Sequence, residues 1–300
     1  MEDLILEYSG GKIAAKAGKT QKVLANGVGF SIAKGQSLAL IGETGSGKTM
    51  TALSIMGLLP SGVSEKGGNM VFMGDAVKGP DAVRELLGRR IVYIPQSGAE
   101  SLDPSRKVKK QLYDSLKRAG AFGLKKAALE KLALSGFEDP KAIMEKYPFQ
   151  LSGGMAQRVT IALAACSDAK LIIADEPSNG LDEDFAEDFL GLVRSVFPDA
   201  AVLMITHDIS MASQCGQIVV LCGGKVLEKG PAAEILADPG HPYTKALIGA
   251  LPEFGMVQTQ VLRHGKSDCP FYERCPAACD ACLKTIPVRE EAGRSRRCVL

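Results

Sequence analysis

Residues 42–49 have the composition and spacing of a phosphate-binding loop. They read GETGSGKT, which fits the pattern G-x-x-x-x-G-K-[ST], and they lie between an apolar run and a helical run. Glycines let consecutive backbone N–H groups turn toward phosphate oxygens, Lys48 adds a positive charge, and Thr49 offers a hydroxyl to Mg²⁺. An ordinary glycine-rich turn is the alternative, and the strand-loop-helix context disfavours it. The expected nucleotide-binding residues are Gly42, Glu43, Thr44, Gly45, Ser46, Gly47, Lys48 and Thr49.

Two acidic residues follow an apolar run at residues 171–174. Asp175 and Glu176 are therefore expected at the carboxyl end of a central strand, which is where α/β sheets bind ligands. We predict that Asp175 holds Mg²⁺, directly or through water, and that Glu176 orients and polarises an attacking water. A strand that merely ends in solvated acids is the alternative, which the phosphate-binding loop in the same chain disfavours.

A third candidate site is the start of a helix at Ser152. Ser152 is a good N-cap, and Gly153 and Gly154 leave backbone N–H groups exposed at the positive end of the helix dipole. This helix start is a second anion-binding feature, ahead of Asp175 in the chain. One chain cannot easily direct two such helix ends at one nucleotide. A site formed by one chain therefore does not explain the helix start at Ser152.

The elements that must hold these residues are typical of a buried parallel sheet with covering helices. Wholly apolar runs suit strands that are buried on both faces. Phe185, Phe189, Val193 and Phe197 recur every four residues, which indicates one stripe of a covering helix. A polar, amphipathic helical pattern fills residues 108–147. The expected strands lie at 36–41, 69–72, 90–94, 171–174, 201–205 and 218–221.

Composition excludes several classes of protein. The 300 residues suit one large domain with an appendage, and no apolar run reaches the length of about 18 residues that spans a bilayer. Lys and Arg number 36 against 34 Asp and Glu, a net charge of +2, and Trp is missing, so the balance does not favour a nucleic-acid partner. The acidic start is too short for a signal peptide, so we expect the chain in the cytoplasm.

Five of the eight cysteines crowd into the last 32 residues. In a cytoplasmic chain this pattern points away from structural disulfides. Thiolates at Cys269, Cys275, Cys282 and Cys298 can hold an iron–sulfur cluster, with Cys279 as a substitute ligand. The spacing fits zinc ribbons poorly, but zinc, and free or disulfide-linked thiols, stay as alternatives. We assign a metal at this place a structural role because no nearby residue suggests redox exchange.

The order of the motifs resembles that of the ATP-binding cassette (ABC) family. GETGSGKT resembles its Walker A motif, LSGGM at 151–155 its signature, and LIIADEP at 171–177 its Walker B motif. Gln96 after the strand IVYIP resembles the Q-loop, residues 178–182 resemble the D-loop, and His207 after the strand AVLMIT resembles the switch histidine.

The resemblance covers roughly residues 1–250 and implies further roles. Gln96 would join Thr49 at Mg²⁺, and His207 would contact the γ-phosphate and report its presence. Tyr8 is the best placed aromatic side chain to stack on adenine, with Phe30 a weaker candidate and a core position for Tyr8 as the alternative. The implied catalytic residues are Glu176, His207 and Gln96, and the implied nucleotide-binding residues beyond the loop are Asp175, Tyr8, Ser152, Gly153 and Gly154.

Two further stretches narrow the resemblance. HPYTKAL at 241–247 and the Cys-rich tail are similar to those of the ATPase subunits of oligopeptide, dipeptide and nickel importers, and in some members the tail ligates a [4Fe–4S] cluster. Departures from that group concern the transporter partner and leave the nucleotide chemistry intact. They are Ser97-Gly98 where Asp-Pro is usual, Asn179 and Gly180 where Thr or Ala is usual, and Ser295-Arg296-Arg297 where a His is usual.

We therefore expect an α/β protein with a P-loop NTPase (RecA-like) core, an antiparallel β subdomain, a helical subdomain at about 97–165, and a small Cys-rich C-terminal extension. The ABC nucleotide-binding domain would span residues 1–250 and the extension residues 251–300. By resemblance, two such subunits, identical or homologous, meet head to tail at the cytoplasmic face of the membrane. They would hydrolyse ATP with Mg²⁺ to drive uptake of a peptide, nickel or a metal chelate through two transmembrane permease subunits, with an extracytoplasmic solute-binding protein.

Other functions stay open at this point. One is a non-transport ABC ATPase that acts on nucleic acid and carries a metal-bearing module; the net charge, the lack of Trp and the HPYTKAL stretch argue against it. A P-loop kinase is another, but the LSGGM helix has no role in it. Export in place of import is a third, and separate chains with this tail favour import by resemblance only.

Overall fold

The computed structural model describes residues 3–18, 20–179, 183–251, 259–265, 267–291 and 293–300. Within these residues the larger sheet has the strand order β12-β13-β11-β10-β4-β9-β8-β7. The strands from β10 to β7 run parallel, and β11, β13 and β12 continue the sheet antiparallel. Their bounds are β4 Ser37–Ile41, β7 Ile91–Ile94, β8 Leu171–Asp175, β9 Ala201–Thr206, β10 Gln217–Cys222, β11 Lys225–Pro231, β12 Arg289–Glu291 and β13 Arg294–Arg296.

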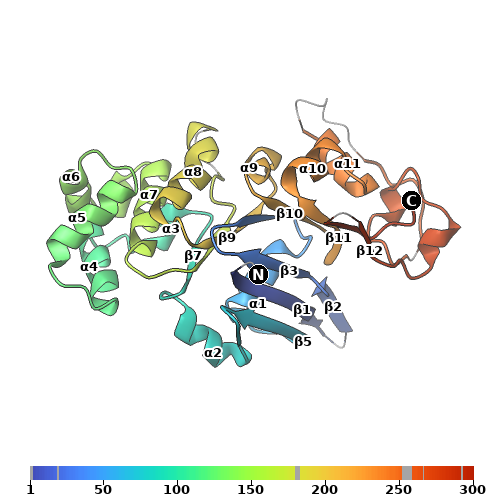
Figure 1. Ribbon diagram of the computed structural model, residues 1–300, viewed down its shortest axis with the longest axis horizontal. Coiled ribbons are helices and arrows are strands. Elements are labelled where there is room, and N and C mark those ends of the chain that lie inside the picture. The colour runs from blue at the N-terminus through green and yellow to red at the C-terminus, as the bar shows by residue number, and fades with distance from the viewer. Residues whose placement is uncertain (1–2, 19, 180–182, 252–258, 266, 292) are drawn as a thin grey trace.

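The parallel part of this sheet is buried on both faces, as its apolar runs predict. Along β4, Ala39 and Ile41 belong to one apolar core while Leu38 and Leu40 belong to the other, because successive side chains point to opposite faces. Figure 1 shows that four helices cover one face of the sheet and that α1, Lys48–Ile55, lies on the other. The four helices are α8 Glu183–Val196, α9 Ile209–Ser213, α10 Ala232–Ala237 and α11 Pro242–Gly249.

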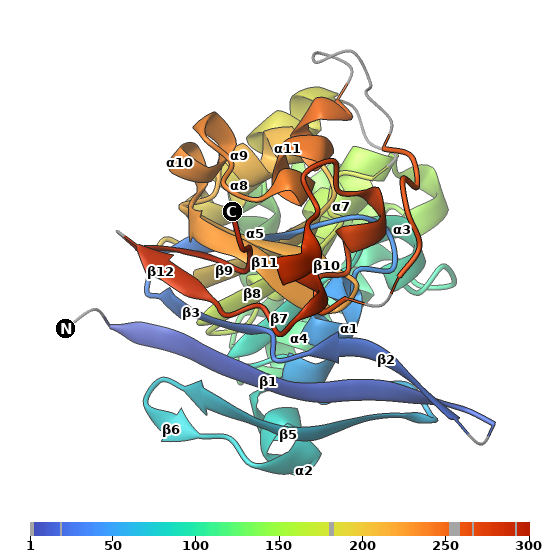
Figure 2. The same cartoon turned by 90° about the vertical axis from the view of Figure 1, so that its right-hand side faces the viewer.

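A smaller, antiparallel sheet packs under α1. Its strand order is β2-β1-β5-β6, with β3 also paired to β1, and Figure 2 shows it lying below the larger sheet. Of this sheet, the sequence predicted only the end of β5, at residues 69–72. The rest of β5 was missed because it is mostly polar and exposed. The bounds are β1 Leu4–Ala17, β2 Thr20–Asn26, β3 Gly29–Ala33, β5 Val63–Phe72 and β6 Asp75–Ala76, followed by helix α2 Gly79–Leu86.

A group of helices lies at one end of the molecule, at the left of Figure 1. It has an apolar core of its own, in which Leu112, Leu116, Ala128 and Leu132 are almost completely buried. The helices are α3 Gly98–Ser101, α4 Val108–Arg118, α5 Leu124–Leu134, α6 Pro140–Glu145 and α7 Gly153–Ala164, with a 3₁₀ turn at Pro148–Gln150. The amphipathic pattern at 108–147 predicted α4, α5 and α6, and the helix start at Ser152 predicted α7, whereas the short helix α3 was not predicted.

The C-terminal part packs against the larger sheet. Strand β13 pairs with β11, so that Glu228 lies opposite Arg296, and Phe271 and Ile286 belong to the core of the sheet's helix-covered face. Two 3₁₀ turns, at Tyr272–Arg274 and Asp280–Leu283, hold part of the Cys-rich segment. The boundary at residue 250 stays a prediction. No helix among the described residues is long and apolar enough to cross a membrane.

Candidate nucleotide-binding site

The predicted site residues meet at the carboxyl ends of four neighbouring parallel strands. In the order β4-β9-β8-β7, these strands lead into the loop that begins at Gly42, into His207, into Asp175 and Glu176, and toward Gln96. Because parallel strands present their carboxyl ends at one edge of a sheet, side chains far apart in sequence come together there. This edge is the candidate site.

The phosphate-binding loop is held tightly against the end of β10. Gly42 has a φ of 147°, and a Cβ at this position would lie 2.1 Å from the carbonyl oxygen of Leu221. A side chain larger than hydrogen would therefore push the loop away from the sheet, since Cβ atoms do not approach backbone so closely. The loop's first glycine thus fixes where the loop leaves the strand.

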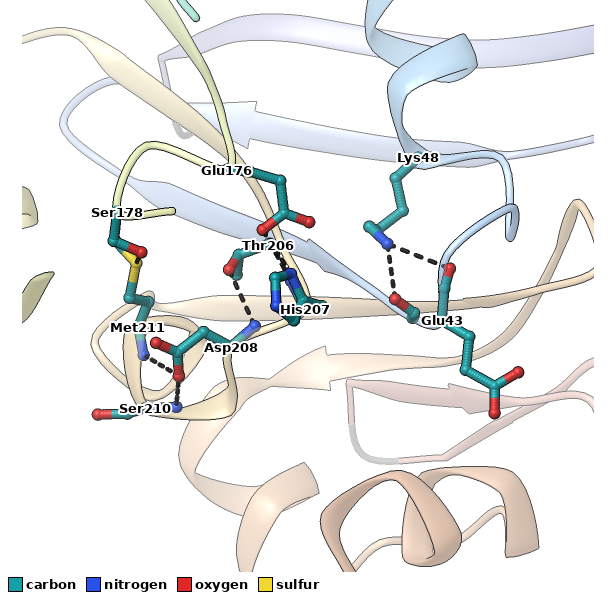
Figure 3. A network of polar contacts seen from close by, with 10 residues as sticks. Glu43, Lys48, Glu176, Ser178, Thr206, His207, Asp208, Ser210 and Met211 are labelled. Carbon is teal, nitrogen blue, oxygen red and sulfur yellow. Dashed lines mark hydrogen bonds and ion pairs between the residues drawn. The ribbon is translucent and has the colours of Figure 1, made fainter. Parts of the chain in front are cut away.

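Lys48 is buried and folded onto its own loop. Its Nζ donates to the carbonyl oxygens of Gly42 at 2.6 Å and Glu43 at 3.2 Å, as Figure 3 shows. Burial lowers the pKa of Lys48, and the nearby carboxylates of Glu176 and Asp175 oppose this shift. The two carbonyl contacts hold the ammonium group at the strand ends, where an incoming phosphate can compete with the carbonyl oxygens for it.

Asp175 has the surroundings of a cation ligand. The hydroxyl of Tyr93 donates to its Oδ2 at 3.3 Å, while Oδ1 is buried and has no partner among the described residues. Burial raises the pKa of Asp175, and the neighbouring Glu176 carboxylate adds to the shift. A buried, partly unsatisfied carboxylate beside a hydroxyl fits the hard oxygen ligands that Mg²⁺ requires. Gln96 is exposed at the end of the adjacent strand.

Tyr93 was missed by the sequence reasoning. It lies opposite Ile173 in the pairing of β7 with β8, two residues before Asp175. The available signal was a tyrosine hydroxyl near the end of a predicted strand. That signal has a meaning only if β7 and β8 are known to be neighbours. Burial raises the pKa of Tyr93 to about 12, so this hydroxyl stays a donor at neutral pH.

Glu176 and His207 contact each other directly. His207 Nδ1 lies 2.7 Å from Glu176 Oε2, and the backbone N–H of His207 donates to the same oxygen at 3.3 Å. Glu176 adopts a φ of 46°, which is uncommon for a residue with a side chain, and its N–H donates to the carbonyl of Ile205. The turn after β8 therefore presents the carboxylate to the residue that follows β9 (Figure 3).

The helix start at Ser152 has the predicted cap. Ser152 Oγ accepts a hydrogen bond from the N–H of Met155 at 3.3 Å, and Ser152 and Gly153 are exposed. Gln157 in the same helix donates to the carbonyl of Pro95 at 3.2 Å. The residue just before Gln96 is thereby tied to α7.

Gly98 explains one departure from the importer group. A Cβ at Gly98 would lie 2.6 Å from the backbone nitrogen of Gln157, so α3 touches α7 there without a side chain between them. Ser97 caps α3 by accepting from the N–H of Glu100. The Ser97-Gly98 pair therefore has a packing role in this chain.

The expectation that Tyr8 stacks on adenine does not fit the structure. Tyr8 is buried, its ring packs on Phe30 at a centroid distance of 5.7 Å, and its hydroxyl donates to Glu65. Burial raises its pKa. Leu6 and Tyr8 share one face of β1, so the ring belongs to the apolar core between the two sheets. In the D-loop, Gly180, Leu181 and Asp182 lie outside the described residues.

The four predicted cysteine ligands come together around one cavity. Cys269, Cys275, Cys282 and Cys298 are buried and line a small cavity, of about 10 Å³, with His241 and Arg297. Burial raises the pKa of Cys269 to about 11, and the other three thiols add to the shift. All eight cysteines are described, and none forms a disulfide. No group of three or more His, Cys, Asp or Glu among the described residues is arranged to hold a metal ion.

Fold and site together define a P-loop ATPase. The profile of a family described as ABC transporter matches residues 25–179, and that of the oligopeptide/dipeptide transporter C-terminal region matches residues 227–282. The chain therefore belongs to the ABC transporter family, whose ATPase domains couple ATP hydrolysis to transport.

Individual relatives agree with this assignment. The chain is 35% identical to a dipeptide transport ATP-binding protein of Haemophilus influenzae, with 89% of this chain and 86% of the relative covered. It is 33% identical to an oligopeptide transport ATP-binding protein of Bacillus subtilis (92% and 90% covered) and 35% identical to a metal-staphylopine import system ATP-binding protein of Staphylococcus aureus (76% and 87% covered).

A solved structure has the same fold. It is a dimeric ATP-binding cassette in a post-hydrolysis state bound to ADP and Pi, with a TM-score of 0.66 and 25% identity, covering 76% of this chain and 99% of that one.

Proposed function

We propose that this chain is the ATP-hydrolysing subunit of an importer that takes up peptides or metal chelates. The match of its C-terminal region to oligopeptide/dipeptide transporters supports peptides, and the names of the relatives support peptides and, for one of them, a metal chelate. The observation that carries the ATPase assignment is the meeting of Lys48, Asp175, Glu176 and His207 at neighbouring strand ends. The antiparallel sheet and the group of helices would be the two subdomains of an ABC ATPase.

The proposed chemistry is phosphoryl transfer from ATP to water, which requires mainly positioning and charge stabilisation. Lys48 and the loop amides would bind the phosphates. Mg²⁺, when bound through Thr49, Gln96 and Asp175, would neutralise the charge of the β- and γ-phosphates. Glu176 would accept a proton from the attacking water, and His207 would hold the Glu176 carboxylate in place while it contacts the γ-phosphate.

We propose that each ATP is bound between two chains, by the loop of one and the Ser152 helix start of the other. In support, this helix start is exposed and belongs to the group of helices at the left of Figure 1, whereas α1 lies beneath the centre of the larger sheet. The backbone N–H groups of Gly153 and Gly154, at the positive end of the helix dipole, suit a phosphate. The partner would be a second copy or a homologous ATPase.

Two inactive full-length variants test the shared site. Ser152→Arg disables the helix start and Lys48→Ala disables the loop, so neither variant alone should hydrolyse ATP. A mixture forms dimers with one intact site, and we expect about a quarter of wild-type turnover at random mixing. If each variant stays inactive after mixing with the other, the shared-site proposal is wrong.

The remaining partners are proposed from the same group of relatives. Two transmembrane permease subunits would dock on the helices that follow Gln96, which holds the ATPase at the cytoplasmic face of the membrane. An extracytoplasmic solute-binding protein would deliver the solute. Because Gln157 ties α7 to Pro95, movement at Gln96 would reach both the docking helices and the Ser152 helix start. Uptake of a labelled dipeptide by cells with and without the chain tests the solute class.

We propose that Cys269, Cys275, Cys282 and Cys298 hold a [4Fe–4S] cluster with a structural role. In support, the four thiols line one cavity, and Arg297 Nε, buried at this cavity, has no partner among the described residues. The cluster would join distant parts of the C-terminal segment. Anaerobic purification should give brown protein with iron and sulfide. Colourless protein with zinc would establish the alternative, and the Cys279→Ser variant is the matched control because Cys279 is exposed.

A further inference from the structure

Two residues of the segment that matches the transporter C-terminal region, Tyr243 and Arg274, contact the phosphate-binding loop at Glu43. The carboxylate of Glu43 accepts two hydrogen bonds from Arg274, at 2.8 Å each, one from each terminal nitrogen. The backbone N–H of Glu43 donates to the hydroxyl of Tyr243 at 2.9 Å. Two residues more than 190 positions away in sequence therefore hold the second residue of the loop.

The Arg274 side chain also packs against a neighbouring aromatic ring. Its guanidinium lies 5.1 Å from the centroid of the Phe271 ring, and about a quarter of the side chain is exposed. The hydrogen bonds to Glu43 raise the pKa of Arg274 further above its ordinary value. A planar guanidinium that binds both oxygens of a carboxylate fixes orientation as well as distance.

Tyr243 acts on the backbone of the loop. It is 1% exposed, and its ring meets Phe271 edge to face at a centroid distance of 5.3 Å. The peptide unit between Gly42 and Glu43 is planar, so holding its N–H sets the direction of its C=O. That same C=O, on Gly42, accepts the 2.6 Å hydrogen bond from Lys48 Nζ. Tyr243 and Lys48 are thus joined through one peptide plane.

We propose that Tyr243 and Arg274 are positioning residues of the nucleotide site. They hold the Gly42–Glu43 peptide in one orientation, and this peptide sets where Lys48 and the following loop amides meet the phosphates. Neither side chain needs to touch ATP. The C-terminal segment is in this way part of the nucleotide site of its own chain, and the effect requires neither a metal nor a partner subunit.

A double-mutant cycle on the full-length chain tests the Arg274 contact. ATP affinity is measured by fluorescence titration for the wild type, Glu43→Gln, Arg274→Gln and the double variant. We expect each single change to weaken ATP binding about threefold to fivefold, and the double variant to be no weaker than either, because both remove the same contact. Arg274→Lys keeps the charge but not the paired geometry and should recover part of the loss. Additive effects would overturn the proposal.

Tyr243→Phe tests the second contact. It keeps the ring on Phe271 and removes the acceptor of the Glu43 N–H, so we expect ATP binding to weaken about fivefold. In steady-state hydrolysis KM should rise more than kcat falls. Tyr272→Phe and Arg289→Gln are matched controls, because Tyr272 packs on Arg263 and Arg289 donates to Val299 and Leu300, away from the loop.

Thermal unfolding separates positioning from simple attachment of the C-terminal segment. If Arg274→Gln and Tyr243→Phe lower the melting temperature but leave ATP affinity at the wild-type value, the two residues only anchor the segment and the proposal is wrong. Because binding of ATP by the chain alone is measured, the result does not depend on the transporter or the solute.

Discussion

The strand-end site and the cysteine-lined cavity are two sites built in opposite ways. At the strand ends, regular pairing places Asp175, Glu176 and His207 at the ends of the neighbouring strands β8 and β9, and hydrogen bonds fix each of them. Around the cavity, Cys275 and Cys282 lie at or within short 3₁₀ turns, and the four thiols line a space of only about 10 Å³.

The difference lies in what holds the functional groups when no ligand is bound. A strand end is set by the sheet's hydrogen bonds, so the nucleotide site is largely formed by folding alone. The cavity walls are short turns and extended chain, which gain their spacing from tertiary packing and from whatever fills the cavity. We therefore expect changes at the strand ends to alter chemistry with little effect on stability, and changes at the cavity to do the reverse.

The largest effect is expected for Glu176→Gln. The amide keeps the size of the side chain but cannot accept the proton of the attacking water, so hydrolysis should slow at least about a hundredfold while ATP binding persists. Single-turnover hydrolysis and equilibrium ATP binding measure the two steps. Glu100→Gln, at an exposed position of helix α3, is the control. Near-wild-type turnover in Glu176→Gln would remove Glu176 from the proposed role.

Asp175→Asn should act on Mg²⁺. The variant keeps a partner for the Tyr93 hydroxyl and removes the negative charge, so the Mg²⁺ concentration required for half-maximal hydrolysis should rise about tenfold to a hundredfold. Asp168→Asn is a matched control just before the other end of β8, where Asp168 pairs with Lys170 and Arg90. Equal Mg²⁺ titrations for wild type and Asp175→Asn would contradict the assignment.

Cys282→Ser should have the smaller, structural effect that the cavity implies. We expect loss of iron and sulfide from anaerobically purified protein and a melting temperature lower by about 3 °C or more, with hydrolysis within about threefold of wild type. Cys279→Ser, whose sulfur lies 3.9 Å from that of Cys282 but is exposed, should keep the metal. If Cys279→Ser loses iron and Cys282→Ser keeps it, the ligand set is wrong.

The same contrast explains what the sequence could predict. The loop at 42–49, the acids after β8 and the cap at Ser152 depend on short-range rules of turns, strand ends and helix starts, so local residues suffice. Tyr93, Tyr243 and Arg274 gain their meaning from contacts with residues 82, 200 and 231 positions away. No local pattern encodes such contacts, because they depend on which strands and turns become neighbours.

Tyr8 was assigned to the wrong surroundings for a related reason. An aromatic residue upstream of the loop fits both an adenine platform and a core position, and only the pairing of β1 with β3 and β5 decides between them. In β1 the ring turns toward Phe30 and the hydroxyl toward Glu65, so the residue is part of the core between the sheets.

Tyr8→Leu tests this core position, with the smallest effect expected on nucleotide binding. The variant loses a buried ring and the hydrogen bond to Glu65, so the free energy of unfolding should fall by about 2 kcal/mol. ATP affinity of the folded protein should stay within about twofold of wild type, because the ring packs on Phe30 and its hydroxyl contacts Glu65. Phe30→Leu removes the other ring of the pair and should behave alike. A Tyr8→Leu variant that stays folded yet binds ATP much more weakly than Phe30→Leu would place adenine on Tyr8, and the buried hydroxyl contact with Glu65 would then have to open for nucleotide to enter.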